Sequence, residues 1–264
     1  MTAQIDLAAA PSVEQQAAQL EQAAPWYDSR AGLNHELIKH AAGKIMAASR
    51  GPRALEMSST GGVMTEDFAR HFPHLDVVQP IASQPERIRA LLPSGSQLCE
   101  CPFEDFRPSG RYDAVLLAWV LEYLPDPDGF LTRAKKWLAP GGKIIIIAAN
   151  AESLHRRVGV ELGLLNKLDQ LSEGDLALGR RRLYTWDALA TDIAISGLYP
   201  LGMEGILLKP LSSGQMQDWP AELRRAFFKL AVIEPRLCSE IFASSCRPED
   251  AAAVDRSLGR PNLR

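Results

Sequence analysis

Short apolar runs alternate with helical patterns through the middle of the chain. From residue 53 onward, runs rich in β-forming residues are separated by segments whose apolar residues recur at the spacing of a helix. Strands that alternate with helices build parallel sheets, and the crossover helices cover both faces. The pattern therefore predicts an α/β domain with a sheet between two helical layers, built on RALEM, LDVVQ, SQLCEC, YDAVLLA and GKIIIIAA.

Helical spacing also marks the chain before this alternation. The stretches VEQQAAQLEQAA and GLNHELIKHAAGKIMAASR carry apolar residues at helical intervals, and APWYDSRA interrupts them. Two helices are thus predicted ahead of the sheet. We expect residues 1–50 to form an N-terminal helical lid on a domain of residues 51–246.

The alternation stops after Asn150. Residues 151–183 carry helical and loop patterns in place of the alternating strand and helix patterns. Insertions at the carboxyl ends of strands usually shape substrate sites in α/β sheets. We therefore expect a helical substrate insertion over these residues.

Helix and strand signals return after the insertion. Thr185 is the predicted N-cap of a helix that Gly197 closes. The stretches PLGMEGILLKP and LCSEIFASSC then predict two strands that pair as a closing hairpin. Residues 247–264 contain almost no large apolar side chains, so we expect a flexible tail there.

Composition and charge narrow the class of ligand. A content of 46% hydrophobic and 23% charged residues is typical of an ordinary globular protein. The formal net charge of −3 disfavours a protein that grips a nucleic-acid backbone, so a small-molecule ligand is expected instead. No window approaches the roughly 18 apolar residues of a membrane helix, so we expect no membrane span.

The cysteines and the N-terminal sequence bear on the cellular compartment. The start MTAQIDLAAAPSVEQQ lacks the basic-then-apolar layout of a signal peptide, which predicts a cytoplasmic protein with reduced thiols. Cys99 and Cys101 flank one residue of a predicted strand, so their thiols are expected on opposite faces, where they pack and do not bind a metal. No metal site is predicted.

Taken in order, several motifs resemble the class I S-adenosylmethionine-dependent methyltransferases, in particular a bacterial subgroup that acts on small molecules. The resemblance covers about residues 25–246. It implies a Rossmann-like seven-stranded, mostly parallel sheet with a reversed last strand, and S-adenosylmethionine across the carboxyl ends of the first strands. The motifs are ALEMSSTGG, FEDF, YDAVLLAWVLEYLPDP, WLAPGGKIIIIAANAESLHRR, RRRLYTWDAL and LLKPL.

The loop after the first strand departs from the family pattern, which is an acidic residue, any residue, Gly, Cys or Ser, and Gly. Glu56 is kept, but the expected glycines are replaced by Ser58 and Thr60, and only Gly61 and Gly62 remain. Glycine lets the backbone approach a ligand closely, whereas the hydroxyls of the replacements can donate to a carboxylate. We expect the loop to hold the methionine part of the cofactor.

A second departure follows the second strand, where the family presents an acidic side chain to both ribose hydroxyls. Here the residue is Gln79, whose amide lacks the charge-assisted strength of a carboxylate. The resemblance places further contacts after the third and fourth strands. The cofactor contacts expected outside the glycine loop are Gln79, Pro80, Phe103, Glu104, Ala118 and Trp119.

Three residues are the candidates for the acceptor side of the site. Asn150 ends the fifth strand, which is a position that faces the reaction centre in an α/β sheet. His155 is the insertion's histidine, and its ordinary pKa of about 6.5 suits removal of a proton. Tyr184 is a donor and acceptor that can close on a substrate.

Basic residues flank both ends of the insertion. They either bind a carboxylate or phosphate of the substrate or form a solvated basic face, and the sequence leaves both interpretations open. These residues are Arg156, Arg157, Arg180, Arg181 and Arg182.

The function expected from the resemblance is transfer of a methyl group to oxygen or nitrogen of a small metabolite. An alternative uses the same cofactor intramolecularly, giving azetidine-2-carboxylate and methylthioadenosine, and is motivated by Ser58, Thr60 and Gln79. A second alternative is a non-catalytic binding module, against which the retained Glu56, FEDF and NAESLHRR argue. The identity of the acceptor and the oligomeric state stay open at this point.

Overall fold

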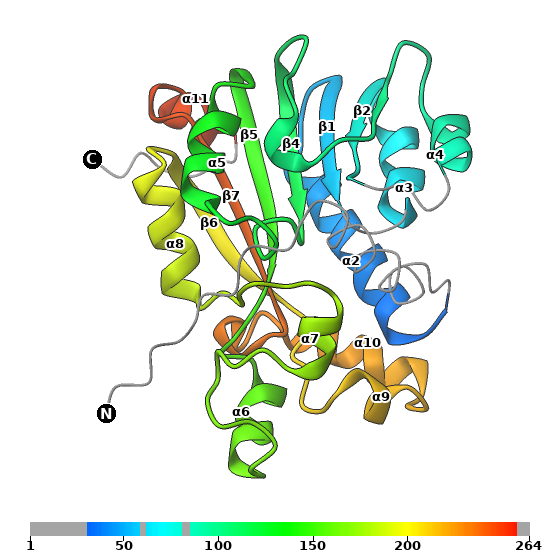
Figure 1. The fold of residues 1–264 in the computed structure, drawn as a ribbon, viewed down its shortest axis with the longest axis vertical. Coiled ribbons are helices and arrows are strands. Elements are labelled where there is room, and N and C mark those ends of the chain that lie inside the picture. The colour runs from blue at the N-terminus through cyan, green and yellow to red at the C-terminus, as the bar shows by residue number, and fades with distance from the viewer. Residues whose placement is uncertain (1–30, 59–61, 81–84, 258–264) are drawn as a thin grey trace.

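The sheet of this protein has seven strands in the order β3-β2-β1-β4-β5-β7-β6 (Figure 1). The structure is a computed structural model that describes residues 31–58, 62–80 and 85–257. All neighbouring strands pair in parallel except β7, which is antiparallel to both β5 and β6. The prediction of a Rossmann-like, mostly parallel sheet with a reversed last strand is confirmed. The strands are β1 (Arg53–Ser58), β2 (His74–Val78), β3 (Leu98–Cys99), β4 (Tyr112–Ala118), β5 (Leu138–Ala149), β6 (Tyr199–Ile206) and β7 (Glu240–Cys246).

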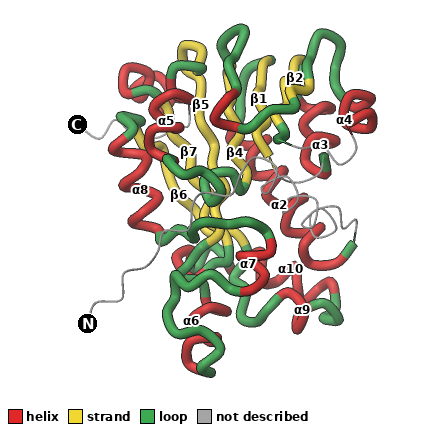
Figure 2. Tube along the Cα trace, viewed as in Figure 1, coloured by secondary structure: helices red, strands yellow, loops and turns green. Residues whose placement is uncertain are grey.

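Helices cover both faces of the sheet, as the alternating pattern predicts. In Figures 1 and 2, α5 and α8 lie on one side and α2 and α3 on the other, while α6, α7, α9 and α10 gather at one end. No helix in the described ranges has the length and apolar character needed to cross a membrane. The helices are α2 (Gly32–Ala48), α3 (Val63–His71), α4 (Pro85–Leu91), α5 (Pro127–Lys135), α6 (Leu154–Glu161), α7 (Glu173–Ala177), α8 (Trp186–Ile195), α9 (Ser213–Met216), α10 (Ala221–Leu230) and α11 (Ala251–Ser257).

Strand β5 explains why the sheet separates two apolar layers. Ile145 and Ile147 belong to the layer under α2 and α3, whereas Ile144 and Ile146 belong to the layer under α5 and α8. All four side chains are fully buried because successive residues of a strand point to opposite faces. Burying such a side chain contributes about 1.5–3 kcal/mol, so the uninterrupted apolar run specifies a central strand.

Helix α2 packs directly on the sheet. Its apolar stripe, which includes Leu37, Ala41 and Ile45, is buried in the layer that faces α3. Lys143 on β5 donates from its Nζ to the carbonyl oxygen of Ala48 at 3.0 Å, which ties the end of the helix to the sheet. The remainder of the predicted lid, residues 1–30, lies outside the described residues.

The two thiols of the CEC stretch lie together, which corrects the prediction that they point to opposite faces. The Sγ atoms of Cys99 and Cys101 are 3.2 Å apart. Strand β3 ends at Cys99, so the alternation of a strand does not apply to the residues that follow. Burial, together with the neighbouring Cys99, raises the pKa of the Cys101 thiol to about 12.

The chain after β7 also differs from the flexible tail that was expected. A 3₁₀ turn over Pro248–Asp250 leads into α11, and Ala251 and Val254 are buried against Leu201 and Cys246. Small side chains let the first turn of α11 approach the sheet closely. Residues 258–264 lie outside the described residues.

Asp76 joins three strands of the sheet through its carboxylate. Tyr112 of β4 donates to Oδ2 at 2.8 Å, Arg53 of β1 lies 3.3 Å from the same atom, and the backbone N–H of Gln97 donates to Oδ1 at 3.0 Å. Burial raises the pKa of Asp76, but the hydrogen bonds, that of Tyr112 foremost, outweigh it and lower the pKa on balance. The ionised form is therefore the one that stabilises the fold.

We expect Asp76→Ala to lower the free energy of unfolding by about 3 kcal/mol, because it removes several hydrogen bonds to a buried charge. Tyr112→Phe, which removes one of them, should cost about 1 kcal/mol. Since the folded pKa lies below the ordinary value of 3.8, this stability is present above that value and is lost as the pH falls through the folded pKa. Urea unfolding at several pH values measures the difference in free energy of unfolding between the wild type and Asp76→Ala. A difference that stays the same in acid would contradict the assignment.

Candidate functional site

The carboxyl ends of the parallel strands and the start of β7 meet at one edge of the sheet. Because β7 runs antiparallel, its first residue, Glu240, pairs with Ala149 at the end of β5 and with Ile206 at the end of β6. Trp119 and Asn150 directly follow β4 and β5 at the same edge. Ligands of open α/β sheets bind at this edge.

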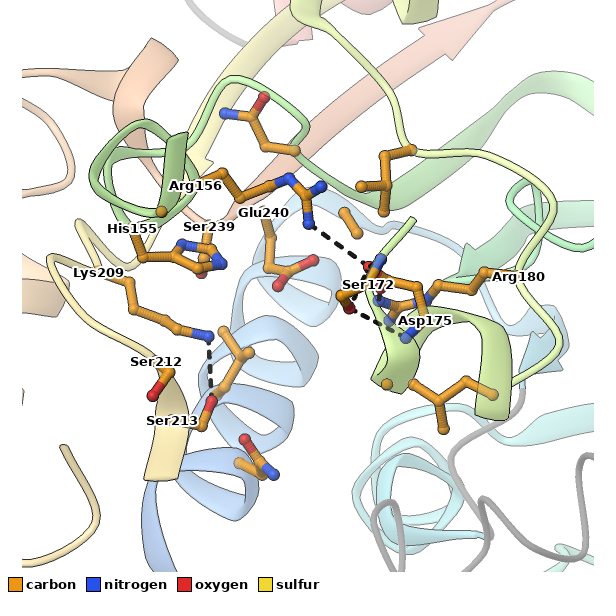
Figure 3. A pocket seen from close by; sticks show the side chains of 18 of the residues that line it. His155, Arg156, Ser172, Asp175, Arg180, Lys209, Ser212, Ser213, Ser239 and Glu240 are labelled. Atoms are coloured by element: carbon orange, nitrogen blue, oxygen red, sulfur yellow. Dashed lines mark hydrogen bonds and ion pairs between the residues drawn. The ribbon is translucent and has the colours of Figure 1, made fainter. Parts of the chain in front are cut away.

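A cavity of about 630 Å³ opens at this edge (Figure 3). Its walls come from the first half of α2, the segment 151–183, the segment 209–214 and the strand ends. Apolar side chains such as Leu37 and Leu165 line it together with a smaller set of charged and titratable groups. The charged and titratable lining residues are His155, Arg156, Asp175, Arg180, Lys209 and Glu240.

Asp175 holds the insertion together by binding two arginines. Its Oδ1 accepts from Arg180 Nη1 at 2.8 Å, and its Oδ2 lies 3.4 Å from Arg156 Nη1 (Figure 3). Ser172 caps α7 and donates its hydroxyl to Asp175 Oδ2 at 2.6 Å, while Arg156 Nε donates to the carbonyl of Leu168. Burial raises the pKa of Asp175, but the positive charge of Arg180 outweighs it and lowers the pKa on balance. Arg156 and Asp175 are buried and the Arg180 side chain is only 11% exposed, so this part of the basic set is not a solvated face.

The remaining arginines of the basic set do not line the cavity. Arg157 is exposed and donates to the carbonyl of Glu152 at 2.9 Å. Arg182 donates to the carbonyl of Pro125 at 3.1 Å, and the backbone N–H of Arg181 donates to the carbonyl of Glu122 at 2.9 Å. Of the five arginines, only Arg156 and Arg180 lie where a substrate could reach them.

Trp119 and Glu240 form a polar pair on the cavity wall. The indole Nε1 donates to Glu240 Oε2 at 2.7 Å. Trp119 has a backbone φ of +54°, which a bulky residue rarely adopts and which marks strain at a functional edge. Burial raises the pKa of Glu240 to about 7, against the lowering effect of Arg180 and of the indole hydrogen bond.

His155 and Lys209 face the same cavity from α6 and from the chain after β6. Burial, together with the charges of Lys209 and Arg156, lowers the pKa of His155 to about 2, so the ring is neutral at physiological pH. Its Nδ1 is buried and has no hydrogen-bond partner within the described part of the chain. Lys209 Nζ donates to Ser213 Oγ at 3.0 Å, and burial lowers its pKa.

The amide of Asn150 is committed to the backbone. Nδ2 donates to the carbonyls of Arg236 at 2.8 Å and Cys238 at 2.7 Å, and Oδ1 accepts from the N–H of Glu152 at 2.9 Å. Both amide hydrogens are therefore used. Asn150 borders the cavity, and its side chain joins the start of the insertion to the chain that precedes β7.

Tyr184 lies apart from the other two acceptor-side candidates. Its backbone bridges to Asn150, but its ring packs in the apolar layer under α5 and α8. The hydroxyl donates to Asp192 of α8 at 3.0 Å, and burial raises its pKa. Asn150 and His155 line the cavity together, whereas Tyr184 does not.

The residues expected to bind the cofactor cluster at the ends of β1 and β2. Glu56 is 1% exposed and lies between Val77 of β2 and Leu116 of β4 in the register of the sheet. Ser58 is the last residue of β1, and Thr60 lies outside the described residues. Gly62 is the N-cap of α3 and has a φ of +83°, a conformation that would be strained for a residue with a side chain.

The other expected contacts follow β2, β3 and β4. Gln79 is 7% exposed, and its N–H donates to the carbonyl of Cys99 at 3.0 Å. Pro80 comes next and is half-buried, Phe103 is buried, and Glu104 is half-buried in the 3₁₀ turn after β3. Ala118 ends β4 and is buried beside Trp119. Among the described residues, no group of His, Cys, Asp and Glu is arranged to hold a metal ion.

Comparison with known proteins decides the family. The signature of a family described as "Methyltransferase domain" matches residues 27–194. The chain belongs to this methyltransferase family. S-adenosylmethionine is its methyl donor, and the class I resemblance seen in the motifs is confirmed.

Individual relatives of this methyltransferase are distant. Alpha N-terminal protein methyltransferase 1 of Oryza sativa, subspecies indica and japonica, is 33% identical over 114 residues, 38% of this chain. The chain spans only 37% of the length of these curated relatives. The N-methyltransferase NodS of Bradyrhizobium japonicum, solved with S-adenosyl-L-homocysteine, has a TM-score of 0.58 at 15% identity, covering 90% of this chain and 99% of its own. The 1,6-didemethyltoxoflavin-N1-methyltransferase of Burkholderia thailandensis has a TM-score of 0.58 at 14% identity, covering 90% of this chain and 91% of its own, so both share the fold.

The strand-end residues of the methyltransferase fit the methyl donor chemically. The buried carboxylate of Glu56 suits a cationic ammonium, the amide of Gln79 suits hydroxyl groups, and Gly62 leaves the backbone open at the start of a helix. These residues lie at or directly after the ends of β1 and β2, although they are distant from one another in the sequence.

Sequence reasoning missed three charged residues of the cavity, Asp175, Lys209 and Glu240. The last two had a signal in the sequence. Lys209 lies within LLKPL, one of the motifs that carry the family resemblance, and Glu240 is a charged residue inside the apolar run of the last strand. A charge at the start of a strand that is otherwise buried indicates either an edge or a site.

We expect Asp175→Ala to destabilise the insertion by roughly 3 kcal/mol, because it leaves two buried arginines without their carboxylate. Hydrogen exchange over residues 151–183 should rise, while the affinity for S-adenosylhomocysteine stays within about twofold, since the strand ends are untouched. Asp187→Ala is the matched control, because Asp187 is 79% exposed and its ion pair with Arg236 lies on the surface. Equal exchange in the two variants would show that the arginine pair does not hold the insertion.

Proposed function

We propose that this methyltransferase transfers the methyl group to oxygen or nitrogen of a small molecule that binds in the cavity. The observation that carries the proposal is the position of the cavity, which opens at the carboxyl ends of β4 and β5 beside the strand ends suited to the cofactor. Its volume of about 630 Å³ lies within the usual range for small-molecule pockets. A protein substrate would need an open groove for its chain.

The residues of the chain would divide the work between them. S-adenosylmethionine supplies a methyl group on a sulfonium, and its displacement requires mainly alignment and exclusion of water. Glu56, Ser58 and Thr60, with Gly62 and Gln79, would hold the cofactor. Pro80, Phe103 and Glu104 would surround its nucleoside end, and Ala118 and Trp119 would lie at the lip of the cleft.

The acceptor would lie between the insertion and α2. His155 and Asn150 border this space, and Asp175 fixes the arginines that close one side of it. Apolar contacts from Leu37 and Leu165 would exclude water from the acceptor. This arrangement favours a compact, partly apolar acceptor over a peptide.

Transfer of an isotope-labelled methyl group tests the proposal. We would incubate the protein with methyl-labelled S-adenosylmethionine and, separately, a low-molecular-mass cell extract, a protein extract or neither. Label in small molecules supports the proposal. Label in protein would favour an activity like that named for the Oryza relative, and enzyme-dependent methylthioadenosine without extract would favour the intramolecular alternative.

Two substitutions at the strand ends should change cofactor affinity in opposite directions. Glu56→Gln should weaken binding of S-adenosylhomocysteine on the order of tenfold, because a charge-assisted contact becomes a neutral one. Gln79→Glu should strengthen it on the order of fivefold for the converse reason. Isothermal titration calorimetry measures both, with the half-buried Glu152→Gln as a control that leaves the affinity unchanged. Two shifts of the same sign would count against these roles.

A further inference from the structure

Glu240 is a buried carboxylate with one of its two oxygens bound. Oε2 accepts from Trp119 Nε1 at 2.7 Å, and the residue is 8% exposed. Within the described part of the chain, no hydrogen bond reaches Oε1, and the residue lines the cavity. The free oxygen is therefore the one available to a ligand.

The position of Glu240 puts this oxygen beside the reaction edge. Glu240 pairs with Ala149, and the side chain that binds it belongs to Trp119, the residue after β4. Glu240 lies two residues before Phe242 on β7 and so shares its face of the sheet; Phe242 packs in the layer under α2, which is the face that carries the cavity. The indole fixes the orientation of the carboxylate.

Charged groups surround Glu240 without neutralising it by a direct ion pair. Lys209 and Arg180 act on it with positive charge and Glu122 with negative charge. Lys209 Nζ is bonded to Ser213 Oγ at 3.0 Å, and no ion pair within 4 Å joins Lys209 to Glu240 among the described residues. Figure 3 shows Lys209 on one side of Glu240 and the pair of Arg180 and Asp175 on the other.

We propose that Glu240 is the general base that takes the proton of the acceptor during methyl transfer. The acceptor's oxygen or nitrogen forms a bond to the methyl carbon while the carbon–sulfur bond breaks, and the electron pair of that bond stays on sulfur. The proton of the O–H or N–H goes to Glu240 Oε1 and then to solvent. The inference rests on the proposed function, because it requires the acceptor to bind in this cavity.

His155 is the competing base in the cavity, and its surroundings disfavour the role. Burial lowers the pKa of His155 to about 2, so the ring holds a proton weakly. Burial raises the pKa of Glu240 to about 7, where a base both accepts a proton well and is largely ionised at physiological pH. Neutral His155 stays on the cavity wall as an uncharged group.

The ionisation of Glu240 can be followed without cofactor or acceptor, because Trp119 reports on it. The fluorescence difference between the wild type and Trp119→Phe isolates one of the five tryptophans. We expect this difference to titrate with a midpoint near pH 7 and to lose the titration in a Glu240→Gln background. The same titration in that background, or none in the wild type, would overturn the assignment.

The kinetic test uses the acceptor found by label transfer. Glu240→Gln keeps the hydrogen bond from the indole, so we expect kcat to fall on the order of 100-fold with unchanged affinity for S-adenosylhomocysteine. The acidic limb of the wild-type profile of kcat against pH, with its midpoint near 7, should be absent from the profile of Glu240→Gln. Glu152→Gln is the control, because Glu152 is a half-buried carboxyl that does not line the cavity.

The outcomes separate the two proposals. If the wild type labels small molecules and Glu240→Gln labels them at the same rate with the same pH profile, the general-base assignment fails and the proposed function stands. If the wild type labels no small molecule, the proposed function fails and the assignment falls with it.

Discussion

The antiparallel pairing of β7 between β5 and β6 is the constraint on which the site depends. Parallel strands bring only their carboxyl ends to the reaction edge, so every group they offer lies in the chain after a strand. A reversed strand brings its first residues to the same edge instead. Glu240 therefore meets Ala149 and Ile206 in register, and its carboxylate comes within reach of the indole that follows β4.

Burial of charge shapes the other wall of the cavity. Charged side chains in an apolar setting need partners, and Asp175 supplies one to Arg156 and Arg180 at once. This network closes the insertion on itself. Lys209 and Glu240 are left as charged groups that face the cavity without forming an ion pair with each other, so the space between them is where a polar part of an acceptor fits best.

Local patterns predict the sheet well because each central strand is buried on both faces. The apolar run KIIIIAA predicts a strand, and the end of the strand–helix alternation after Asn150 marks the insertion that forms one wall of the cavity. The same reasoning failed where a side chain's position depends on residues distant in the sequence. Trp119 and Glu240 are 121 positions apart, and no periodicity of the sequence predicts their hydrogen bond. Tyr184 follows the insertion, yet its hydroxyl turns to Asp192 on the far face of the sheet.

The failures at Cys99 and in the C-terminal segment have a related cause. Where a strand ends after two residues, alternation no longer decides which way a side chain points. The scarcity of large apolar residues around Ala251 predicted a flexible tail, but the small size of alanine allows close packing against Leu201. Composition alone does not distinguish these outcomes.

The central claim is that cofactor and acceptor occupy neighbouring parts of one edge, the cofactor at the ends of β1 and β2 and the acceptor in the cavity under the insertion. Hydrogen–deuterium exchange with and without S-adenosylhomocysteine tests it most directly. The account predicts protection concentrated at residues 55–58, 62–66, 77–80 and 103–106, with little change over residues 154–178. Protection concentrated in the insertion and near Lys209, with none at the ends of β1 and β2, would contradict it.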